Sequence, residues 1–348
     1  MTDPSASLVW RNRKLLLPRP VPRRISLQIT NLCNSKCTMC SIWEIYHQDK
    51  ALHRTELSGE QWLTVVNNAI DSGVMSIDIT GGEPFLKEGV GALLSTVLRR
   101  TGFAGVTTNA LQPERILREI RNVLAEAPDD SLLAVSVSMD GFPGTYAKVR
   151  GVDGHGSVVR LLRELDALRG EYPQLNQQIS FTIMDENVDE MPALMAYALD
   201  EKLIREPDDF TFRPVASGHY YAAENRLLQA QKVADTVTEL QGRHSFRRTL
   251  PFISKIPQNV LEPKRMILPC YAMFASLWID PYGGVAPCVT MTEDVIGNVR
   301  DTGFDLRPIW EGRRADEARQ RIAAEKCAVC WTDCQATESL EYEAAASV

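Results

Sequence analysis

Six short apolar segments alternate with amphipathic segments along residues 25–215 of the 348-residue chain. The apolar segments are typical of strands, whereas the segments between them repeat apolar residues with the period of a helix. Strands separated by helices of this length form a parallel sheet with right-handed crossovers. The pattern therefore predicts an α/β fold whose six units curve into a partial barrel. The expected strands are 25–30, 74–80, 105–108, 132–139, 178–184 and 210–215, and the expected helices are 59–71, 88–100, 114–126, 158–169 and 190–202.

Three cysteines come directly after the first expected strand, in the sequence CNSKCTMC, as Cys33, Cys37 and Cys40. Loops that follow the strands of a parallel α/β barrel gather at one rim, where the active sites of such folds lie. A closed structural metal site takes four protein ligands, whereas three protein ligands leave a coordination position open for chemistry. The spacing therefore predicts a metal centre with an open position at this rim.

Glycines and polar residues follow other expected strands at the same rim. The sequence GGEP at residues 81–84 comes directly after the second strand, and its glycines let a ligand approach the backbone closely. The sequence SVSMDG at residues 136–141 ends the fourth strand and places a hydroxyl and a carboxylate nearby. Taken alone, each stretch is also explained as a turn, because Gly, Pro and Asp-Gly favour turns.

The three-cysteine spacing after strand one, together with GGEP after strand two, resembles the radical S-adenosylmethionine (radical SAM) superfamily over residues 22–220. The resemblance implies a 4Fe-4S cluster held by Cys33, Cys37 and Cys40, whose fourth iron is chelated by the amino group and carboxylate of S-adenosyl-L-methionine. It implies that the cluster, reduced by a flavodoxin or ferredoxin, cleaves this cofactor to a 5'-deoxyadenosyl radical that abstracts hydrogen from the substrate.

The resemblance also assigns residues to the cofactor, although a surface arginine and a helix-capping asparagine explain Arg150 and Asn187 equally well. Met39 stands where the family usually has an aromatic residue, and a flexible thioether can pack against an adenine ring. The expected contacts are Gly81, Gly82, Glu83 and Pro84 at the methionyl amino group, Ser138 and Asp140 at the ribose and carboxylate, Arg150 at the methionyl carboxylate, and Asn187 and Met39 at the adenine.

Five further cysteines lie near the C-terminus, and a cytoplasmic chain of this kind is expected to use them for metal binding instead of disulfides. The first two flank a hairpin expected to turn at residues 281–284, and the others form CxxCWxxC. A four-cysteine zinc site shares the CxxC half. The segment resembles the twitch version of the SPASM extension, which implies an auxiliary 4Fe-4S cluster. The expected ligands are Cys270, Cys288, Cys327 and Cys330, and Cys334 is left as a replacement ligand for Cys330, an inert thiol or a hydrogen-atom donor.

These patterns together predict a partial (β/α)6 TIM-like barrel with a small C-terminal β-hairpin and helix iron-sulfur domain. The expected segments are an N-terminal arm at 1–22, the radical SAM barrel at 23–222, a helical linker at 223–265 and the auxiliary-cluster domain at 266–348.

The cysteine spacing resembles dehydrogenases that oxidise 2-deoxy-scyllo-inosamine and decarboxylases of nucleoside-antibiotic pathways, which implies a polar substrate such as a sugar, aminocyclitol or nucleoside. Dehydrogenation with the second cluster as electron acceptor is the leading hypothesis, and redox-neutral decarboxylation or epimerisation is the alternative. Peptide modification ranks third, because no leader-peptide-binding domain is expected before residue 25. Arg213, His219 and Tyr220 are candidate substrate contacts, although a paired arginine and a packed tyrosine explain two of them equally well.

Charge and hydropathy exclude other classes. The chain has 38 basic and 45 acidic residues, a net charge of −7, which disfavours a nucleic-acid binder or a non-catalytic iron-sulfur regulator with a basic face. It has no apolar run approaching the roughly 20 residues that a membrane span needs, and no apolar core of a secretory signal near its N-terminus. A cytoplasmic enzyme is therefore expected, with neither nucleic acid nor membrane as a partner.

Overall fold

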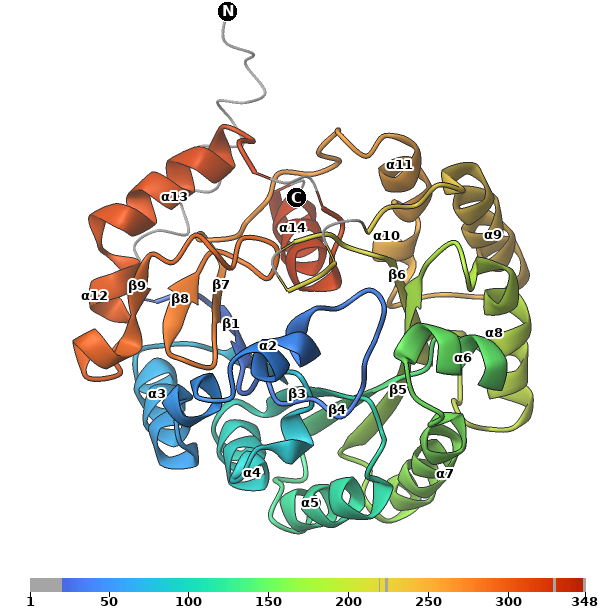
Figure 1. The fold of residues 1–348 in the computed structure, drawn as a ribbon, viewed down its shortest axis with the longest axis horizontal. Helices are drawn as coiled ribbons and strands as arrows, with labels where there is room; N and C mark the ends of the chain where they lie inside the picture. The colour runs from blue at the N-terminus through green and yellow to red at the C-terminus, as the bar shows by residue number, and fades with distance from the viewer. Residues whose placement is uncertain (1–20, 219, 223–224, 328–329, 347–348) are drawn as a thin grey trace, which may run out of the picture.

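The structure is a computed structural model and describes residues 21–218, 220–222, 225–327 and 330–346. It confirms the parallel α/β sheet, because all six expected strands form and pair in parallel in chain order. The strands are β1 (Arg24–Gln28), β2 (Ser76–Thr80), β3 (Phe103–Thr108), β4 (Leu132–Ser138), β5 (Leu175–Ile183) and β6 (Phe210–Pro214). Figure 1 looks onto the rim at their carboxyl ends, with helices packed around the outside.

Five helices occupy the expected places between these strands, and Ser58 with Gln61 forms the capping box at the start of the first. Two short helices at the rim, α2 and α6, were not predicted. The crossover helices are α3 (Gly59–Asp71), α4 (Val90–Thr101), α5 (Pro113–Ala125), α7 (His155–Glu171) and α8 (Met191–Asp200), and the rim helices are α2 (Ile42–Gln48) and α6 (Pro143–Arg150). Single 3-10 turns lie at η1 (Leu52–Thr55), η2 (Pro84–Leu86), η3 (Val188–Glu190), η4 (Pro207–Asp209) and η5 (Val299–Thr302).

The C-terminal part continues the barrel sheet. Strand β7 (Ser276–Ile279) pairs in parallel with β1, and the expected hairpin at residues 281–284 leads to the antiparallel β8 (Gly284–Ala286) and β9 (Gly297–Asn298). The sheet order is β6-β5-β4-β3-β2-β1-β7-β8-β9. The remaining helices are α9 (Ala230–Arg243), α10 (Leu250–Ile253), α11 (Ile256–Leu261), α12 (Arg307–Trp310), α13 (Arg313–Ala323) and α14 (Asp333–Ala346).

Helix α14 lies in the opening of the curved sheet, between β7 on one side and β6 on the other (Figure 1). Its first residue, Asp333, pairs with Arg213 of β6 at 2.9 Å, and Glu338 pairs with Arg24 of β1 at 3.2 Å. The helix therefore bridges strands at both sides of the barrel opening.

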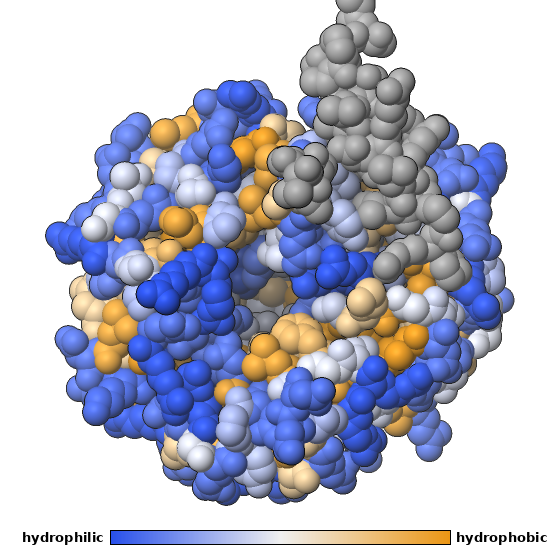
Figure 2. Space-filling view, turned by 180° about the vertical axis from the view of Figure 1, so that it is seen from behind, coloured by the Kyte–Doolittle hydropathy of each residue, from blue (hydrophilic) through white to orange (hydrophobic). Residues whose placement is uncertain are grey.

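The two faces of the strands differ because alternate side chains point to opposite sides of a sheet. On the outer face of β1 and β2, Ile25, Leu27, Ile77 and Ile79 are fully buried in the core shared with the helices. The inner face is polar and lines a cavity, with Arg24, Ser26, Gln28, Asp78 and Thr80 from the same two strands. The face of the molecule opposite to the rim is hollowed near its centre, with hydrophilic side chains on most sides of the hollow and hydrophobic ones below it (Figure 2).

Within the described residues, no helix has the length and apolar character that crossing a bilayer requires.

Candidate active site

The loop that carries the first three cysteines is fixed by the end of α6. The backbone N–H of Lys36 donates to the carbonyl of Arg150 at 3.0 Å, and that of Thr38 donates to the carbonyl of Val149 at 2.9 Å. Gly151 ends the helix with φ of +65°, and a Cβ there would lie 2.3 Å from the Lys36 carbonyl oxygen. Only glycine fits this contact, so the sequence after α6 determines where the cysteine loop lies.

The three thiols line the end of the cavity at the rim. Burial is the main cause that raises the pKa of Cys33 to about 12 and that of Cys40 to about 11, and the neighbouring Cys37 thiol contributes to both shifts. Arg150 Nη1 donates to Cys37 Sγ at 3.6 Å, and Asn109 Nδ2 donates to Cys33 Sγ at 3.8 Å. Donors aimed at sulfur stabilise thiolates once they bind iron.

These residues fit an iron-sulfur cluster with three protein ligands. Within the described part of the chain, no three His, Cys, Asp or Glu side chains lie close enough to bind one metal ion together. A 4Fe-4S cluster needs wider spacing between its ligands, because each thiolate binds a different iron. The buried Nε of Arg150 has no hydrogen-bond partner among the described residues, so a polar acceptor is missing on this side. The donor set is therefore suited to three cluster thiolates and a polar ligand beside them.

The GGEP stretch packs directly on the cysteine loop. The N–H of Gly82 donates to the Thr30 carbonyl at 2.7 Å, and a Cβ on Gly82 would lie 2.4 Å from the Leu32 carbonyl oxygen. Gly81 and Gly82 line the cavity, as expected for residues that let a ligand approach. Close backbone packing is thus a second reason for both glycines.

Glu83 and Pro84 lie behind the rim instead of lining the cavity. The Glu83 carboxylate accepts hydrogen bonds from Thr108 Oγ1 at 2.9 Å and from the Asn109 N–H at 2.7 Å, both at the end of β3. Burial raises the pKa of Glu83 to about 7. Its carboxylate therefore positions Asn109, and a direct bond from Glu83 to the cofactor stays a prediction that this placement does not favour.

Asn109 lines the cavity and was missed in the sequence. Its Nδ2 donates to Asn34 Oδ1 at 2.8 Å in addition to its contact with Cys33. The signal was present, because GVTTN ends the third strand with polar residues at the functional rim, as GGEP and SMDG do for other strands.

Arg150 and Asp140 form a buried ion pair across the ends of α6 and β4. Burial lowers the pKa of Arg150, but the Asp140 carboxylate and the Cys37 thiol outweigh it and raise that pKa above its usual value. Ser138 and Arg150 line the cavity, whereas Asp140 is fully buried and accepts the Thr182 N–H at 2.6 Å.

Asn187 does not line the cavity. Its Nδ2 donates to the carbonyls of Thr182 at 2.9 Å and Asp140 at 3.2 Å, and its Oδ1 accepts the Met184 N–H at 2.8 Å. The amide of Asn187 therefore joins the ends of β4 and β5. This geometry does not support the predicted contact between Asn187 and adenine.

Met39 is buried and lines the cavity near the cysteines. Of the expected substrate contacts, Arg213 lines the cavity and pairs with Asp333, and Tyr220 lines it with its ring 5.6 Å from that of Trp278. Arg213 is therefore paired and also accessible from the cavity, and Tyr220 is packed against a ring and also accessible from the cavity. His219 lies outside the described residues.

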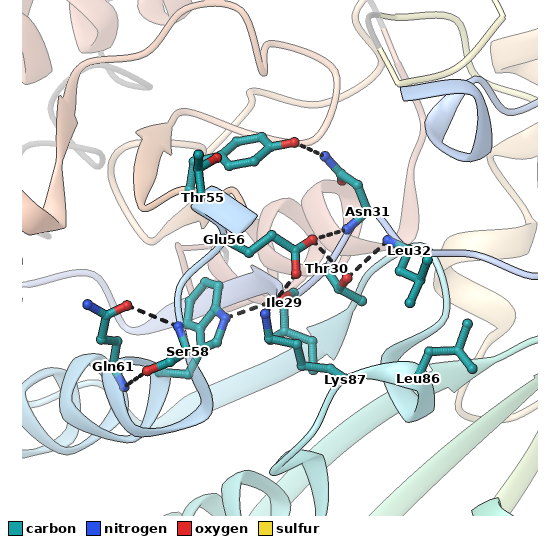
Figure 3. A network of polar contacts seen from close by, with 12 residues as sticks. Ile29, Thr30, Asn31, Leu32, Thr55, Glu56, Ser58, Gln61, Leu86 and Lys87 are labelled. Carbon is teal, nitrogen blue, oxygen red and sulfur yellow. Dashed lines mark hydrogen bonds and ion pairs between the residues drawn. The ribbon is translucent and has the colours of Figure 1, made fainter. Parts of the chain in front are cut away.

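A second network, shown in Figure 3, fixes the start of the cysteine loop and was also missed. The buried Glu56 carboxylate accepts hydrogen bonds from Thr30 Oγ1 and the Asn31 N–H, each at 2.8 Å, and from Lys87 Nζ at 2.7 Å. Asn31 Nδ2 donates to the Tyr282 hydroxyl at 3.1 Å, in the turn between β7 and β8. The network thus ties the first cysteine loop to the C-terminal hairpin.

The second cysteine group encloses a small cavity of its own, lined by Cys270, Cys288, Cys327 and Cys330. Burial raises the pKa of Cys270, and the other three thiols raise it further because they lie close to it. The remaining walls are mostly apolar, from residues such as Leu268 and Trp331, with the hydroxyls of Thr290 and Ser339 among them. Four converging thiols fit a fully ligated iron-sulfur cluster. Cys334 lies in α14, but its side chain is outside the described residues.

Two short loops separate this small cavity from the main one. Cys288 and Thr290 face the small cavity whereas Val289 faces the main one, and Cys330 faces the small cavity whereas Thr332 and Asp333 face the main one. The main cavity, about 440 Å³, therefore runs from the first three cysteines to the wall of the second cysteine site.

The sequence matches the radical SAM superfamily over residues 27–198 and the SPASM iron-sulfur cluster-binding domain over residues 270–335. The chain therefore contains a radical SAM domain and a C-terminal SPASM domain. These domains establish S-adenosylmethionine and 4Fe-4S clusters, one catalytic and one auxiliary, as its cofactors.

Particular relatives are similar over different shares of the chain. The PqqA peptide cyclase of Rhodopseudomonas palustris is 27% identical over 314 residues, which cover 85% of this chain and 75% of the relative. The sporulation killing factor maturation protein SkfB of Bacillus subtilis is 30% identical over 138 residues, 38% of this chain and 30% of the relative. Streptococcus suis SuiB bound to its precursor peptide SuiA shares the fold, with 16% identity, a TM-score of 0.60, and coverage of 90% of this chain and 71% of SuiB.

Proposed function

We propose that this enzyme is an oxidoreductase that dehydrogenates a polar, sugar-like or nucleoside small molecule inside the barrel. The observation that supports this most is the cavity of about 440 Å³ that reaches from Cys33, Cys37 and Cys40 to the loop 330–333 beside the second cysteine group. When bound, S-adenosylmethionine and its cluster supply a 5'-deoxyadenosyl radical that removes a hydrogen atom from carbon, and the auxiliary cluster supplies an acceptor for one electron.

The chain's own residues at the rim hold and orient the cofactors. Cys33, Cys37 and Cys40 would hold the catalytic cluster, and Cys270, Cys288, Cys327 and Cys330 the auxiliary one. Arg150 and Asn109 donate hydrogen bonds to two of the first thiols. The buried side chain of Met39 gives the cavity an apolar surface near these cysteines.

The deeper part of the cavity is suited to a molecule with several hydroxyl groups. Its size lies within the range of small-molecule sites, about 300–1,000 Å³. Its walls offer hydroxyl and amide groups, and aromatic rings lie among them. The polar groups are Ser26, Gln28, Thr80, Ser136 and Gln178, and the rings are Phe103 and Trp278.

A peptide substrate is the second candidate, and the relatives favour it. One relative is named as a peptide cyclase, and the structure of SuiB was solved with its precursor peptide. A polar side chain of a peptide could reach into the same cavity.

The test is the reaction itself, run anaerobically with protein reconstituted with both clusters and reduced by dithionite, flavodoxin or ferredoxin. With small polar metabolites, the proposal predicts a product two electrons more oxidised than the substrate and one 5'-deoxyadenosine for each product. Release of carbon dioxide would instead mean decarboxylation. A product of unchanged oxidation state that gains solvent deuterium only when Cys334 is present would mean epimerisation. Turnover of a peptide, with none of small molecules, would refute the substrate class.

A further inference from the structure

One row of residues inside the barrel crosses five neighbouring strands. Ser26 of β1 is in register with Trp278 of β7 on one side and with Asp78 of β2 on the other. Asp78 is in register with Gly105 of β3, which is in register with Ala134 of β4. All five line the main cavity. The row therefore presents an indole, a hydroxyl and a carboxylate, followed by two positions with almost no side chain.

The negative charge of the Asp78 carboxylate is poorly compensated by neighbouring groups. In the described part of the chain it has no hydrogen-bond donor, and Arg24, at 3.8 Å, is the one basic group within ion-pair distance. Burial raises the pKa of Asp78, and Arg24 lowers it without cancelling the effect. Even so, 37% of the side-chain surface of Asp78 is accessible, and this carboxylate lines the cavity. A cationic ligand would supply the missing partner.

The charges around Asp78 add to this preference. Arg24 is shared with Glu338 of α14, whose carboxylate lies nearer, at 3.2 Å. Arg213, the other arginine at this depth, is paired with Asp333 at 2.9 Å. Among these described residues, three carboxylates face two guanidinium groups, so negative charge is in excess. An anionic substrate group would have to displace an existing ion pair, whereas an ammonium group would not.

The Asp78 carboxylate lies in space that its small neighbours leave. A Cβ on Gly105 would lie 2.5 Å from Asp78 Oδ1, so any larger residue would push the carboxylate away. Gly105 does not adopt a positive φ, so its backbone conformation does not require glycine. The small side chain of Ala134 extends the same space onto the next strand.

Trp278 gives an independent sign of a ligand. Its side chain is 2% exposed and lines the cavity, and its Nε1–H has no hydrogen-bond partner among the described residues. An indole N–H is only a donor, so it needs an acceptor such as a hydroxyl or ether oxygen. Trp278 and Asp78 are two strand spacings apart, about 10 Å, which suits a six-membered ring with a substituent at each end.

We propose that this row binds a polyol substrate that carries a protonated amine, such as an amino sugar or aminocyclitol. Asp78 accepts hydrogen bonds from the ammonium group, which lies in the space above Gly105 and Ala134, and Trp278 donates to an oxygen at the other end of the molecule. The inference rests on the proposed function and narrows its substrate class.

The experiment measures binding without turnover. Protein reconstituted with both clusters, without S-adenosylmethionine, is titrated by ligand-observed saturation-transfer NMR with glucosamine, galactosamine and inosamine and with their hydroxyl counterparts glucose, galactose and inositol. We expect amines to bind the wild type more tightly than their counterparts, and Asp78→Asn to weaken amine binding by roughly tenfold or more, because a charge-assisted hydrogen bond is lost. Three results would overturn the proposal. Amines could bind the wild type and Asp78→Asn equally, amines and their hydroxyl counterparts could bind the wild type equally, or no amine could bind at all.

Further variants separate recognition from folding. Gly105→Ala should weaken amine binding by filling the space beside Asp78, and Trp278→Phe should weaken amines and hydroxyl counterparts alike. Asp71→Asn is the matched control, because Asp71 lies on α3 with 66% of its side chain exposed, where it pairs with Arg100. It should bind every ligand as the wild type does, and thermal unfolding verifies that each variant is folded.

The outcomes also distinguish this inference from the proposed function. Dehydrogenation of a neutral polyol by the wild type, with no preference for amines, would leave the function standing and refute the inference. Binding of amines through Asp78, with a product of unchanged oxidation state, would support the inference and refute dehydrogenation.

Discussion

Gly151 gives the sharpest test of how the cysteine loop is held. In Gly151→Ala the new Cβ would lie 2.3 Å from the Lys36 carbonyl oxygen and 2.9 Å from the Lys36 carbonyl carbon, so backbone must move. The φ of +65° alone costs a non-glycine residue about 1 kcal/mol, and overpacking adds about 1–3 kcal/mol. The free energy of unfolding should therefore fall by about 2–4 kcal/mol.

The movement has a direct consequence for the metal site. Lys36 lies between Cys33 and Cys37, and its N–H is bonded to the carbonyl of Arg150, next to the substituted residue. Displacing this contact moves the thiols relative to one another, so the catalytic cluster should bind weakly or not at all. We expect the reconstituted variant to lose about four irons per chain, the content of one 4Fe-4S cluster.

The assays are denaturant unfolding of the iron-free protein and iron analysis after reconstitution. Gly144→Ala is the matched control, because Gly144 lies in the same helix α6, a Cβ there would meet no heavy atom within 4 Å, and its φ is not positive. It should unfold at the same or a higher denaturant concentration than the wild type and keep its iron. Wild-type stability and iron content in Gly151→Ala would refute the reasoning.

Three further predictions follow from the rim. Glu56→Ala removes the buried partner of the half-buried Lys87 and should lower the free energy of unfolding by about 3 kcal/mol, measured by denaturant titration. The exposed Glu60→Ala should change this free energy little, and equal effects of the two substitutions would contradict the role of Glu56. Burial raises the pKa of Glu83 from 4.5 to about 7, so the contribution of Glu83 to stability is most favourable below pH 4.5 and is lost as pH rises through 7. The free energy of unfolding of the iron-free wild type should therefore fall more steeply between pH 4.5 and pH 7 than that of Glu83→Gln. Equal slopes for the two proteins would contradict this prediction. Cys270→Ala should still form 5'-deoxyadenosine but yield less product, by chromatography of both, and unchanged product would argue against the auxiliary cluster as electron acceptor.

The sequence patterns predict the barrel well because its signals are local. Each of the six strands is a short run of apolar residues that needs no distant partner to be recognised, and the capping box at Ser58 marks its helix start. Helices α2 and α6 were missed because they span 7 and 8 residues, too short for a helical period to show. The pairing of β7 with β1 joins residues about 250 positions apart, and no local pattern specifies it.

The candidate site divides in the same way. Cys33, Cys37 and Cys40 were identified because their spacing is itself the signal. Glu83 was expected to face a ligand, but its orientation depends on the donors at the end of β3, which the local sequence GGEP does not contain.

Asp78 and Glu56 carry no motif at all. Asp78 appears in the sequence as a polar residue of the strand SIDIT, and only the register with Ser26 and Gly105 places it in the cavity. Glu56 becomes important because Thr30, Asn31 and Lys87 converge on it from three segments.

Iron content and 5'-deoxyadenosine formation, measured together on variants of each cysteine group, test the central claim most directly. We expect about eight irons per chain in the reconstituted wild type, and about four in both the Cys33/Cys37/Cys40→Ala variant and the Cys270/Cys288/Cys327/Cys330→Ala variant. The first variant should form no 5'-deoxyadenosine from S-adenosylmethionine and dithionite, whereas the second should still form it. Formation of 5'-deoxyadenosine by the first variant, or zinc in place of iron at the second cysteine group, would contradict the account.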